Sequence, residues 1–272
     1  MADKNSPIGV FDSGVGGLTV AREIMRQMPE ERIVYFGDTA RVPYGNKSAN
    51  TVIRFTRQII RFLLTQDVKA IVIACNTATA YALEAVEGEL EIPIIGVIHA
   101  GARTATQATQ NGKIGIIGTE GTIRSGVYTR VMQKMRPGIE VTGKPCPLLV
   151  PLVEEGLLHD SVTDEIASRY LSELKGKYID TLVLGCTHYP LLRSTVGRLM
   201  GPGVTLVNPA YETALELKQI LAEADLLCSG PSKEKDQYLF YVSDLAEKFT
   251  SFATSILPGA VKETRQINIE EF

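Results

Sequence analysis

Short apolar runs alternate with stretches of helical periodicity along most of this chain. The runs are bounded by polar or turn-forming residues, which is typical of buried strands in a parallel sheet. They predict strands over residues 8–11, 32–36, 71–74, 93–98, 113–118, 179–184, 204–207 and 237–242. Between them, apolar positions that recur at about the helical period of 3.6 predict helices over residues 18–28, 49–63 (after an N-cap at Ser48), 77–88, 122–135, 159–175 and 244–257.

Strands that alternate with helices of this length predict an α/β fold, with mainly parallel sheets that carry helices on both faces. A second strand–helix series begins after residue 98, and 272 residues are comfortable for two small domains. We therefore expect two similar doubly wound domains, one formed by residues 1–98 and 210–272 and the other by residues 99–209. This division makes the chain cross between the domains twice.

The charge content argues against a polyanionic partner. Charged residues make up 22% of the chain, the net charge is −3, and Lys and Arg are dispersed, so no nucleic acid partner is expected. The first residues lack the apolar segment of a signal peptide, and no run approaches the roughly 20 apolar residues that cross a bilayer. We expect a cytoplasmic protein that does not contact membranes.

The four cysteines lie far apart in the sequence, at Cys75, Cys146, Cys186 and Cys228. Without a Cys-x-x-Cys pair they predict neither a disulfide framework nor a metal site. We interpret Cys146 and Cys228 as small buried residues. Cys75 and Cys186 differ because they stand in near-copies of one setting, IVIACNT at residues 71–77 and LVLGCTH at residues 182–188.

Each of these two thiols closes a predicted buried strand, where open α/β sheets bind their ligands. Asn76, Thr77 and Thr187 place hydrogen-bonding side chains beside the thiols. Two facing thiols suit a reaction in which one removes a proton from carbon and the other supplies a proton to the opposite face. Such a reaction inverts a stereocentre. His188, two residues after Cys186, would lower a thiol pKa or shuttle a proton.

A glycine-rich turn, DSGVGG at residues 12–17, follows the first predicted strand. It is not a dinucleotide fingerprint, because position 19 is Thr and Asp12 would repel a pyrophosphate. A small zwitterion fits better, with its carboxylate on backbone N–H groups and its ammonium group near Asp12. The alternative is a tight turn capped by Asp12. The tripeptide at residues 43–45, which follows Asp38, is either part of the same sheet edge or an ordinary loop.

Glu154 and Glu155 end an apolar run that begins at residue 148. We expect one of these carboxylates to reach the site, and the alternative is an exposed surface pair. His99 and His159 have no neighbours comparable to those of His188 and are interpreted as structural.

Four ordered motifs resemble the cofactor-independent aspartate/glutamate racemase family. They are DSGVGGL at residues 12–18, YFGD to PYG at residues 35–45, ACNTA at residues 74–78 and GCTHYP at residues 185–190. The resemblance extends from residue 7 to about residue 214, and the stretch after residue 221 carries no family motif. Asn208 is a departure, since an acidic residue is expected there.

The resemblance implies a two-domain α/β enzyme that binds its substrate in the interdomain cleft. It implies interconversion of L- and D-glutamate without a cofactor, often by a homodimer, to supply D-glutamate for bacterial peptidoglycan and hence cell-wall biogenesis and cell shape. It assigns Cys75 to the α-proton of the D-enantiomer and Cys186 to that of the L-enantiomer. The residues it implies in assisting proton transfer are Asp12, Glu154 and His188. The residues it implies in substrate binding are Asp12, Ser13, Tyr44, Gly45, Asn76, Thr77, Thr119, Thr122, Thr187 and His188.

Three other functions remain open from the residues alone. An aspartate racemase would share the proton chemistry, because no motif encodes the length of the substrate side chain. A Cys–His hydrolase would use Cys186 and His188, and an amino-acid-binding protein would only close on its ligand. Neither of the last two needs Cys75.

Overall fold

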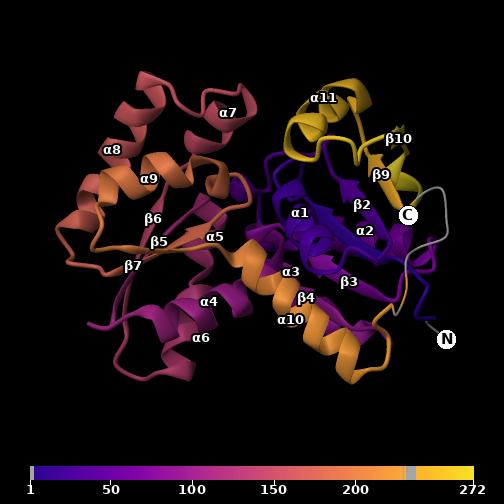
Figure 1. Cartoon of the computed structure of the whole chain (residues 1–272), viewed down its shortest axis with the longest axis horizontal. Helices are drawn as coiled ribbons and strands as arrows, with labels where there is room; N and C mark the ends of the chain where they lie inside the picture. Colours follow the sequence, from indigo (N-terminus) through magenta and orange to yellow (C-terminus); the bar gives the residue numbers. More distant parts are fainter. Residues whose placement is uncertain (1–2, 229, 231–236) are drawn as a thin grey trace.

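The chain builds two separate parallel sheets that lie side by side in a computed structural model, which describes residues 3–228, 230 and 237–272 (Figure 1). The first sheet has the strand order β10-β9-β2-β1-β3-β4 and the second has the order β6-β5-β7-β8. All strand pairings within the described residues are parallel. The predicted fold class, α/β with two mainly parallel sheets, is therefore confirmed.

The strands of the first sheet are β1 (Ile8–Asp12), β2 (Ile33–Gly37), β3 (Ala70–Ile73), β4 (Ile94–Gly96), β9 (Tyr238–Val242) and β10 (Thr264–Gln266). With helices α1 (Leu18–Gln27), α2 (Ala49–Leu64), α3 (Asn76–Val86), α10 (Pro209–Glu223) and α11 (Ala246–Ile256) they form what we call the six-stranded half. Short 3₁₀ helices η1 (Tyr44–Asn46), η2 (Glu87–Glu89) and η4 (Ile269–Glu271) belong to the same half.

The strands of the second sheet are β5 (Lys113–Gly118), β6 (Glu140–Pro145), β7 (Thr181–Gly185) and β8 (Thr205–Val207). We call this sheet the four-stranded half, together with its helices α4 (Val97–Ala108), α5 (Glu120–Ser125), α6 (Val127–Met135), α7 (Leu149–Glu154), α8 (Ser161–Lys175), η3 (Tyr189–Leu192) and α9 (Arg193–Met200).

Strand β1 shows why continuous apolar runs predicted this fold. Its five residues are all buried, because helices cover both faces of the sheet. Val10 packs into a core that includes residues of α1, α10 and α11, whereas the next residue, Phe11, packs into a core that includes residues of α2 and α3. This alternation is the two-residue repeat of a strand.

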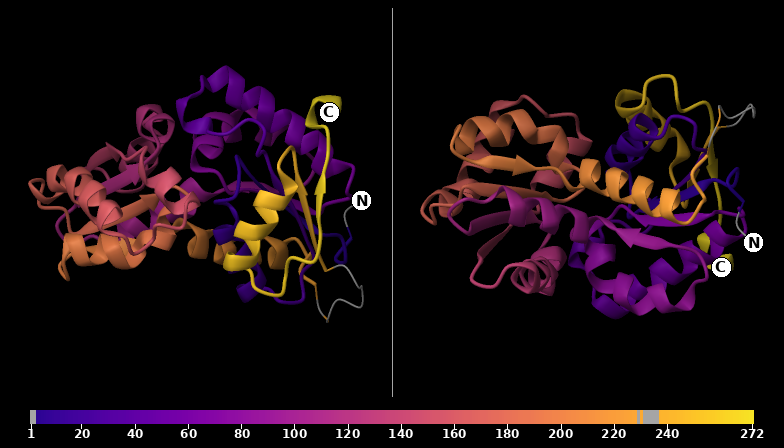
Figure 2. Two further views of the ribbon diagram at one scale, coloured as in Figure 1. Left: turned by 90° about the horizontal axis from the view of Figure 1, so that it is seen from above. Right: turned by 60° about the horizontal axis from the view of Figure 1, so that its bottom comes forward.

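The chain passes between the halves next to α4 and α10. Val97 packs into the core of the six-stranded half, whereas Ile98 packs beside the second sheet. Near the start of α10, Pro209 lies so close to α4 that a Cβ atom at Gly101 would be 2.9 Å from Pro209 Cγ. The right-hand view of Figure 2 shows α10, in orange, running from the junction between the halves along the six-stranded half. We propose the predicted division, residues 1–98 with 210–272 and residues 99–209, as the domain structure.

Two predicted elements are corrected by the structure. The strand expected over residues 93–98 ends at Gly96, where the extended backbone changes to helix α4. The helix expected over residues 122–135 is two helices, because Gly126 has a φ of 67° and ends α5 before α6 begins. That positive φ is a conformation that glycine adopts readily.

The sequence interpretation missed β6 and β10, as well as helices α4, α7, α9 and α10. Strand β6 contains polar residues and has no fully buried position, and it lies at the edge of its sheet. It therefore lacks the continuous apolar pattern of a central strand. None of the described helices is long and apolar enough to cross a membrane.

A buried ion pair lies near the start of β3. Lys69 Nζ is 2.5 Å from Glu31 Oε2, and the two side chains are 0% and 2% exposed. The same ammonium group donates to the backbone oxygens of Lys4, at 2.6 Å, and Leu226, at 2.9 Å. Glu31 Oε1 accepts from the backbone N–H of Cys228 at 2.8 Å. The pair thus joins the start of the chain to the segment after α10.

Lys69→Met should destabilise the protein by about 3–5 kcal/mol, because it leaves the Glu31 charge buried without a partner. Urea unfolding followed by circular dichroism measures the change. Lys69→Met combined with Glu31→Leu should recover much of the loss. Arg169→Met removes an exposed ion pair with Glu165 and serves as a control that should change little. If Lys69→Met unfolded at the same urea concentration as Arg169→Met, the buried ion pair would not stabilise the protein.

Candidate active site

The carboxyl ends of the two sheets face each other, and a thiol stands at each. Cys75 follows β3 and Cys186 directly follows β7, as predicted. The thiol-bearing residues are 5% and 6% exposed, so neither faces open solvent. Both line one cavity of about 40 Å³, whose walls are Ser13, Pro43, Tyr44, Gly45, Cys75, Asn76, Thr77, Thr119, Val150, Cys186, Thr187 and His188.

Cys75 is held as a neutral thiol. It is the N-cap residue of α3, where its sulfur accepts a hydrogen bond from the backbone N–H of Ala78 at 3.4 Å. Its Sγ also lies 3.6 Å from Ser13 Oγ, to which the thiol donates. Burial, together with the nearby Asp12 carboxylate, raises the pKa of Cys75 to about 12. The free protein at neutral pH therefore keeps the proton on this sulfur.

Cys186 lies next to a cation. Its Sγ is 3.7 Å from His188 Nδ1, and His188 Nε2 is 3.0 Å from Glu154 Oε1. Burial by itself would lower the pKa of His188, but the hydrogen bonds with Cys186 and Glu154 outweigh it and raise that pKa to about 10. The bond from His188 lowers the pKa of Glu154. At neutral pH the pair is an imidazolium and a carboxylate, so the Cys186 sulfur lies beside a positive charge.

Asp12 joins the two halves from the end of β1. Its carboxylate accepts from the backbone N–H of Gly14 at 3.2 Å and from Thr187 Oγ1 at 3.4 Å. It is completely buried, and burial raises its pKa above the ordinary value, although His188 opposes this. Asp12 is therefore the turn cap that one interpretation predicted. It also contacts the segment that carries the second thiol.

Three threonine hydroxyls form a cluster across the cleft. Thr77, at the start of α3, lies 2.8 Å from Thr119 Oγ1 and 3.2 Å from Thr122 Oγ1 of the four-stranded half. Thr119 and Thr122 are themselves 3.0 Å apart. Nearby, Tyr128 donates to Asn76 Oδ1 at 2.8 Å. These bonds place the polar side chains predicted after each strand against the opposite half.

Two glycines allow the halves to approach this closely. A Cβ atom at Gly16 would be 2.5 Å from His188 Nδ1 and closer still to Thr187 Oγ1. A Cβ atom at Gly45 would be 2.6 Å from Thr119 Cβ. Both distances are shorter than any carbon side chain tolerates, so larger residues here would push the halves apart.

Tyr44 contributes to the cavity wall, but its hydroxyl is engaged elsewhere. It donates to the Asp38 carboxylate, and burial beside that carboxylate raises the pKa of Tyr44 well above its ordinary value. The phenol is therefore a fixed structural donor. The loop contributes Pro43, Tyr44 and Gly45 to the cavity wall.

The structure brings most of the predicted site residues to one cavity. Three of them, Asp12, Glu154 and Thr122, are not part of its wall and instead contact residues that are. Val150 is a wall residue that sequence reasoning missed, because an isolated apolar side chain carries no chemical signal. Tyr128 was also missed, since its partner Asn76 is distant in sequence.

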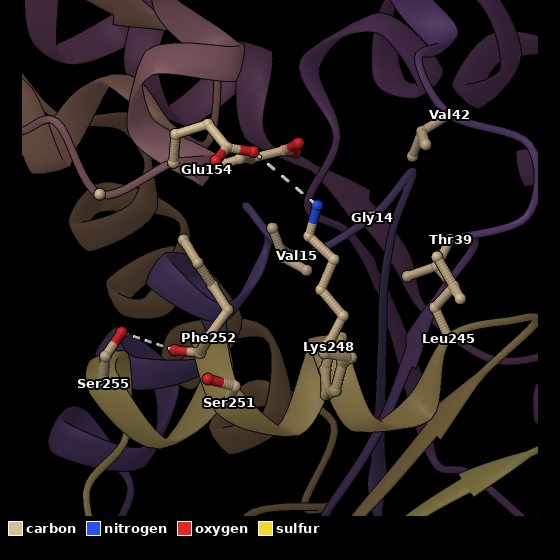
Figure 3. Close-up of a pocket in the computed structure, with 13 residues that line it drawn as sticks. Gly14, Val15, Thr39, Val42, Glu154, Leu245, Lys248, Ser251, Phe252 and Ser255 are labelled. Carbon is tan, nitrogen blue, oxygen red and sulfur yellow. Dashed lines mark hydrogen bonds and ion pairs between the residues drawn. The ribbon is translucent and has the colours of Figure 1, made fainter.

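Two larger cavities adjoin this site, and Glu154 borders both. One, of about 550 Å³, lies between the loop before η1 and the start of α7, and it shares Pro43, Gly45, Thr119 and Val150 with the central cavity. The other, of about 400 Å³, lies between Glu154 and helix α11, where Lys248 extends toward the carboxylates of Glu154 and Glu155 (Figure 3). Among residues 3–228, 230 and 237–272, no group of His, Cys, Asp and Glu forms a metal-binding cluster.

Comparison with known proteins identifies close relatives over nearly the whole chain. A family model described as Asp/Glu/Hydantoin racemase matches residues 8–217. A glutamate racemase from Geobacter metallireducens is 48% identical over 263 residues, which cover 97% of each protein. The solved structure of a glutamate racemase from Bacillus anthracis superimposes with a TM-score of 0.92 at 41% identity and covers 97% of this chain and 98% of that one. A Francisella tularensis glutamate racemase in complex with D-glutamate gives a TM-score of 0.91 at 38% identity, covering 99% and 100%.

The titration of His188 tests the electrostatics of this site. The chain has three histidines, and NMR spectra of ¹³C-labelled histidine, assigned with His188→Asn, resolve the ring of interest. Its cation should persist at neutral pH and be lost as the pH rises through about 10. Glu154→Gln should lower the midpoint, because the carboxylate that stabilises the cation is gone. Glu155→Gln, which removes an ion pair with Lys248 instead, should leave it in place. A His188 midpoint near that of a free imidazole would refute the assigned charge state.

Proposed function

The chain belongs to the Asp/Glu/hydantoin racemase family, and we propose that it interconverts L- and D-glutamate with Cys75 and Cys186 as its two bases, supplying D-glutamate for peptidoglycan. The glutamate racemases that it resembles over almost their full length support this substrate. The observation that carries the mechanism is the pair of buried thiols, one from each half, on a single cavity.

In the direction from L- to D-glutamate, the sulfur of Cys186 takes the α-proton. The Cα–H bond breaks as an S–H bond forms, and the electron pair is delocalised into the substrate carboxylate. Cys75 then gives its own proton to the opposite face of Cα, which completes the inversion. The reverse reaction exchanges the two roles. This is general acid–base catalysis by two groups on either side of one carbon.

The charges around the two thiols suit this division of labour. The imidazolium of His188 stabilises a negative Cys186 sulfur, while the raised pKa of Cys75 keeps its proton available for donation. With the proton on Cys75, Cys186 can accept the α-proton of L-glutamate. To act on D-glutamate, the protein must carry that proton on Cys186 instead of Cys75. The total number of protons is the same in both states. One pH dependence should therefore govern both directions.

The polar wall of the cavity supports an amino acid as the ligand. We assign the substrate ammonium group to the side of Asp12. The two carboxylates of glutamate would lie against hydroxyl, amide and backbone groups of the surrounding residues, namely Ser13, Tyr44, Gly45, Asn76, Thr77, Thr119, Thr122, Thr187 and His188. The cavity of about 40 Å³ has room for only a few water molecules. The cleft must therefore widen to admit glutamate.

A hydrolase that uses a single thiol is a second candidate function, and specific contacts favour it. Cys186, His188 and Glu154 form a continuous chain of hydrogen-bonding groups, as a nucleophile, its base and an orienting carboxylate would. This function leaves Cys75 unexplained, although it lines the same cavity.

We also infer that the protein acts in the cytoplasm, where precursors of the cell wall are assembled, and that it forms a homodimer. Light scattering of the purified protein tests the dimer.

Glutamate in deuterated water tests the proposed reaction. Without added cofactor, L-glutamate should lose optical activity and gain deuterium at Cα. L-aspartate at the same concentration should turn over much more slowly. Faster turnover of aspartate would contradict the substrate, and racemisation without deuterium at Cα would contradict proton transfer through the thiols.

Replacing either thiol should separate the two half-reactions. Cys75→Ser and Cys186→Ser should each lower racemisation by roughly 10²–10⁴-fold, the usual contribution of a positioned acid or base. In Cys75→Ser, exchange at Cα should remain faster with L-glutamate than with D-glutamate, and Cys186→Ser should show the opposite preference. Cys228→Ser, at a partly exposed position away from the cavity, is the matched control. Near-normal racemisation by either Cys75→Ser or Cys186→Ser would contradict the two-thiol mechanism.

A further inference from the structure

The loop at residues 38–46 carries part of the cavity wall and is fixed from behind by a buried carboxylate. Asp38 is fully buried, and its carboxylate accepts a hydrogen bond from the Tyr44 hydroxyl. It also accepts from Arg41 Nε, 2.7 Å from Oδ2, and from Ser243 Oγ, 2.9 Å from Oδ1. The position of this loop therefore depends on where the Arg41 guanidinium lies.

Arg41 is held between two carboxylates. Its side chain is 10% exposed and lies over the ring of Phe55, with Cζ 3.9 Å from the ring centroid. On the side away from Asp38, Nη1 donates to Glu270 Oε1 at 3.0 Å and to Gln58 Oε1 at 2.6 Å. Gln58 Nε2 in turn donates to Glu270 Oε2 at 3.2 Å. Glu270 is thus the outer anchor of the guanidinium.

The backbone that carries Glu270 is packed against the protein, whereas the Glu270 side chain is 64% exposed. This segment lies outside the family match, which ends at residue 217. Glu270 belongs to η4, whose first residue, Ile269, is buried in the core of the six-stranded half. Beyond it, the ring of Phe272 packs edge-on against Phe62 with centroids 5.4 Å apart. These contacts of Ile269 and Phe272 hold Glu270 beside Arg41.

We propose that Glu270 is a positioning residue for substrate binding, acting through Arg41 and Asp38 on the backbone of Tyr44 and Gly45. The inference rests on the proposed function, since it assigns these backbone groups to glutamate. The loop tolerates little movement because Gly45 packs tightly against Thr119 of the other half. Contacts of this kind hold the substrate equally before and during proton transfer. Their loss raises KM and leaves kcat nearly unchanged.

The kinetic test compares neighbouring glutamates of η4. Glu270→Gln should raise KM for both enantiomers by about fivefold, which corresponds to about 1 kcal/mol, and should change kcat by less than about twofold. Because the enantiomers have equal free energy in solution, kcat/KM must fall equally for both. Glu271→Gln is the matched control, since Glu271 accepts from Asn268 and does not contact Arg41. In an Arg41→Gln background, Glu270→Gln should raise KM no further.

Hydrogen exchange tests the positioning without relying on activity. In mass-spectrometric measurements, peptides from residues 38–46 should exchange faster in Glu270→Gln than in the wild type or Glu271→Gln. Unchanged KM and unchanged exchange in Glu270→Gln would overturn the inference. An effect on KM that adds in full to that of Arg41→Gln would also overturn it, because the route through Arg41 would then be wrong. Failure of the wild-type protein to racemise glutamate would refute the proposed function instead, and the exchange measurement would still decide whether Glu270 holds the loop.

Discussion

Two thiols can act on one carbon only if the carboxyl ends of two sheets meet with almost nothing between them. This close approach is the constraint on which the rest of the site depends. It explains the glycines at positions 16 and 45, where any Cβ would strike the opposite half. It also explains why the contacts there are short polar ones, such as Thr187 to Asp12 and Thr77 to Thr119. Small side chains let each half complete the other's hydrogen bonds.

The same proximity makes the electrostatics asymmetric. Burial and the nearby Asp12 carboxylate raise the pKa of Cys75, whereas an imidazolium lies beside Cys186. The two sequence settings look alike up to the thiol and diverge immediately after it, at Asn76 and Thr187. A reaction between mirror-image substrates is therefore carried out by groups that are not mirror images. The two enantiomers have equal free energy in solution, but this does not require the two bases to have equal strength.

The parts of this structure that the sequence predicted are those with a local physical signature. Central strands such as β1 and β7 are buried on both faces, so their apolar runs are continuous. The edge strand β6 is partly exposed, and its pattern did not predict a strand. The strand predicted before α4 was too long, because the last apolar residues of that run belong to the helix. The thiols, Asp12 and His188 could be found because their chemistry is distinctive and their motifs are ordered. Val150, Tyr128 and Glu270 could not, since their roles arise only from contacts with residues far away in the sequence.

The two chain crossings have a mechanical consequence. Because α4 and the start of α10 pack against each other at Gly101 and Pro209, the covalent links between the halves are gathered on one side of the molecule, away from α7 and α11 (Figure 1). Because both links lie on that side, we infer that the halves separate by rotation about it. Such a rotation widens the cleft most at the far side, where the cavities of about 400 and 550 Å³ that Glu154 borders lie. The register between Cys75 and Cys186 would be restored each time the cleft closes.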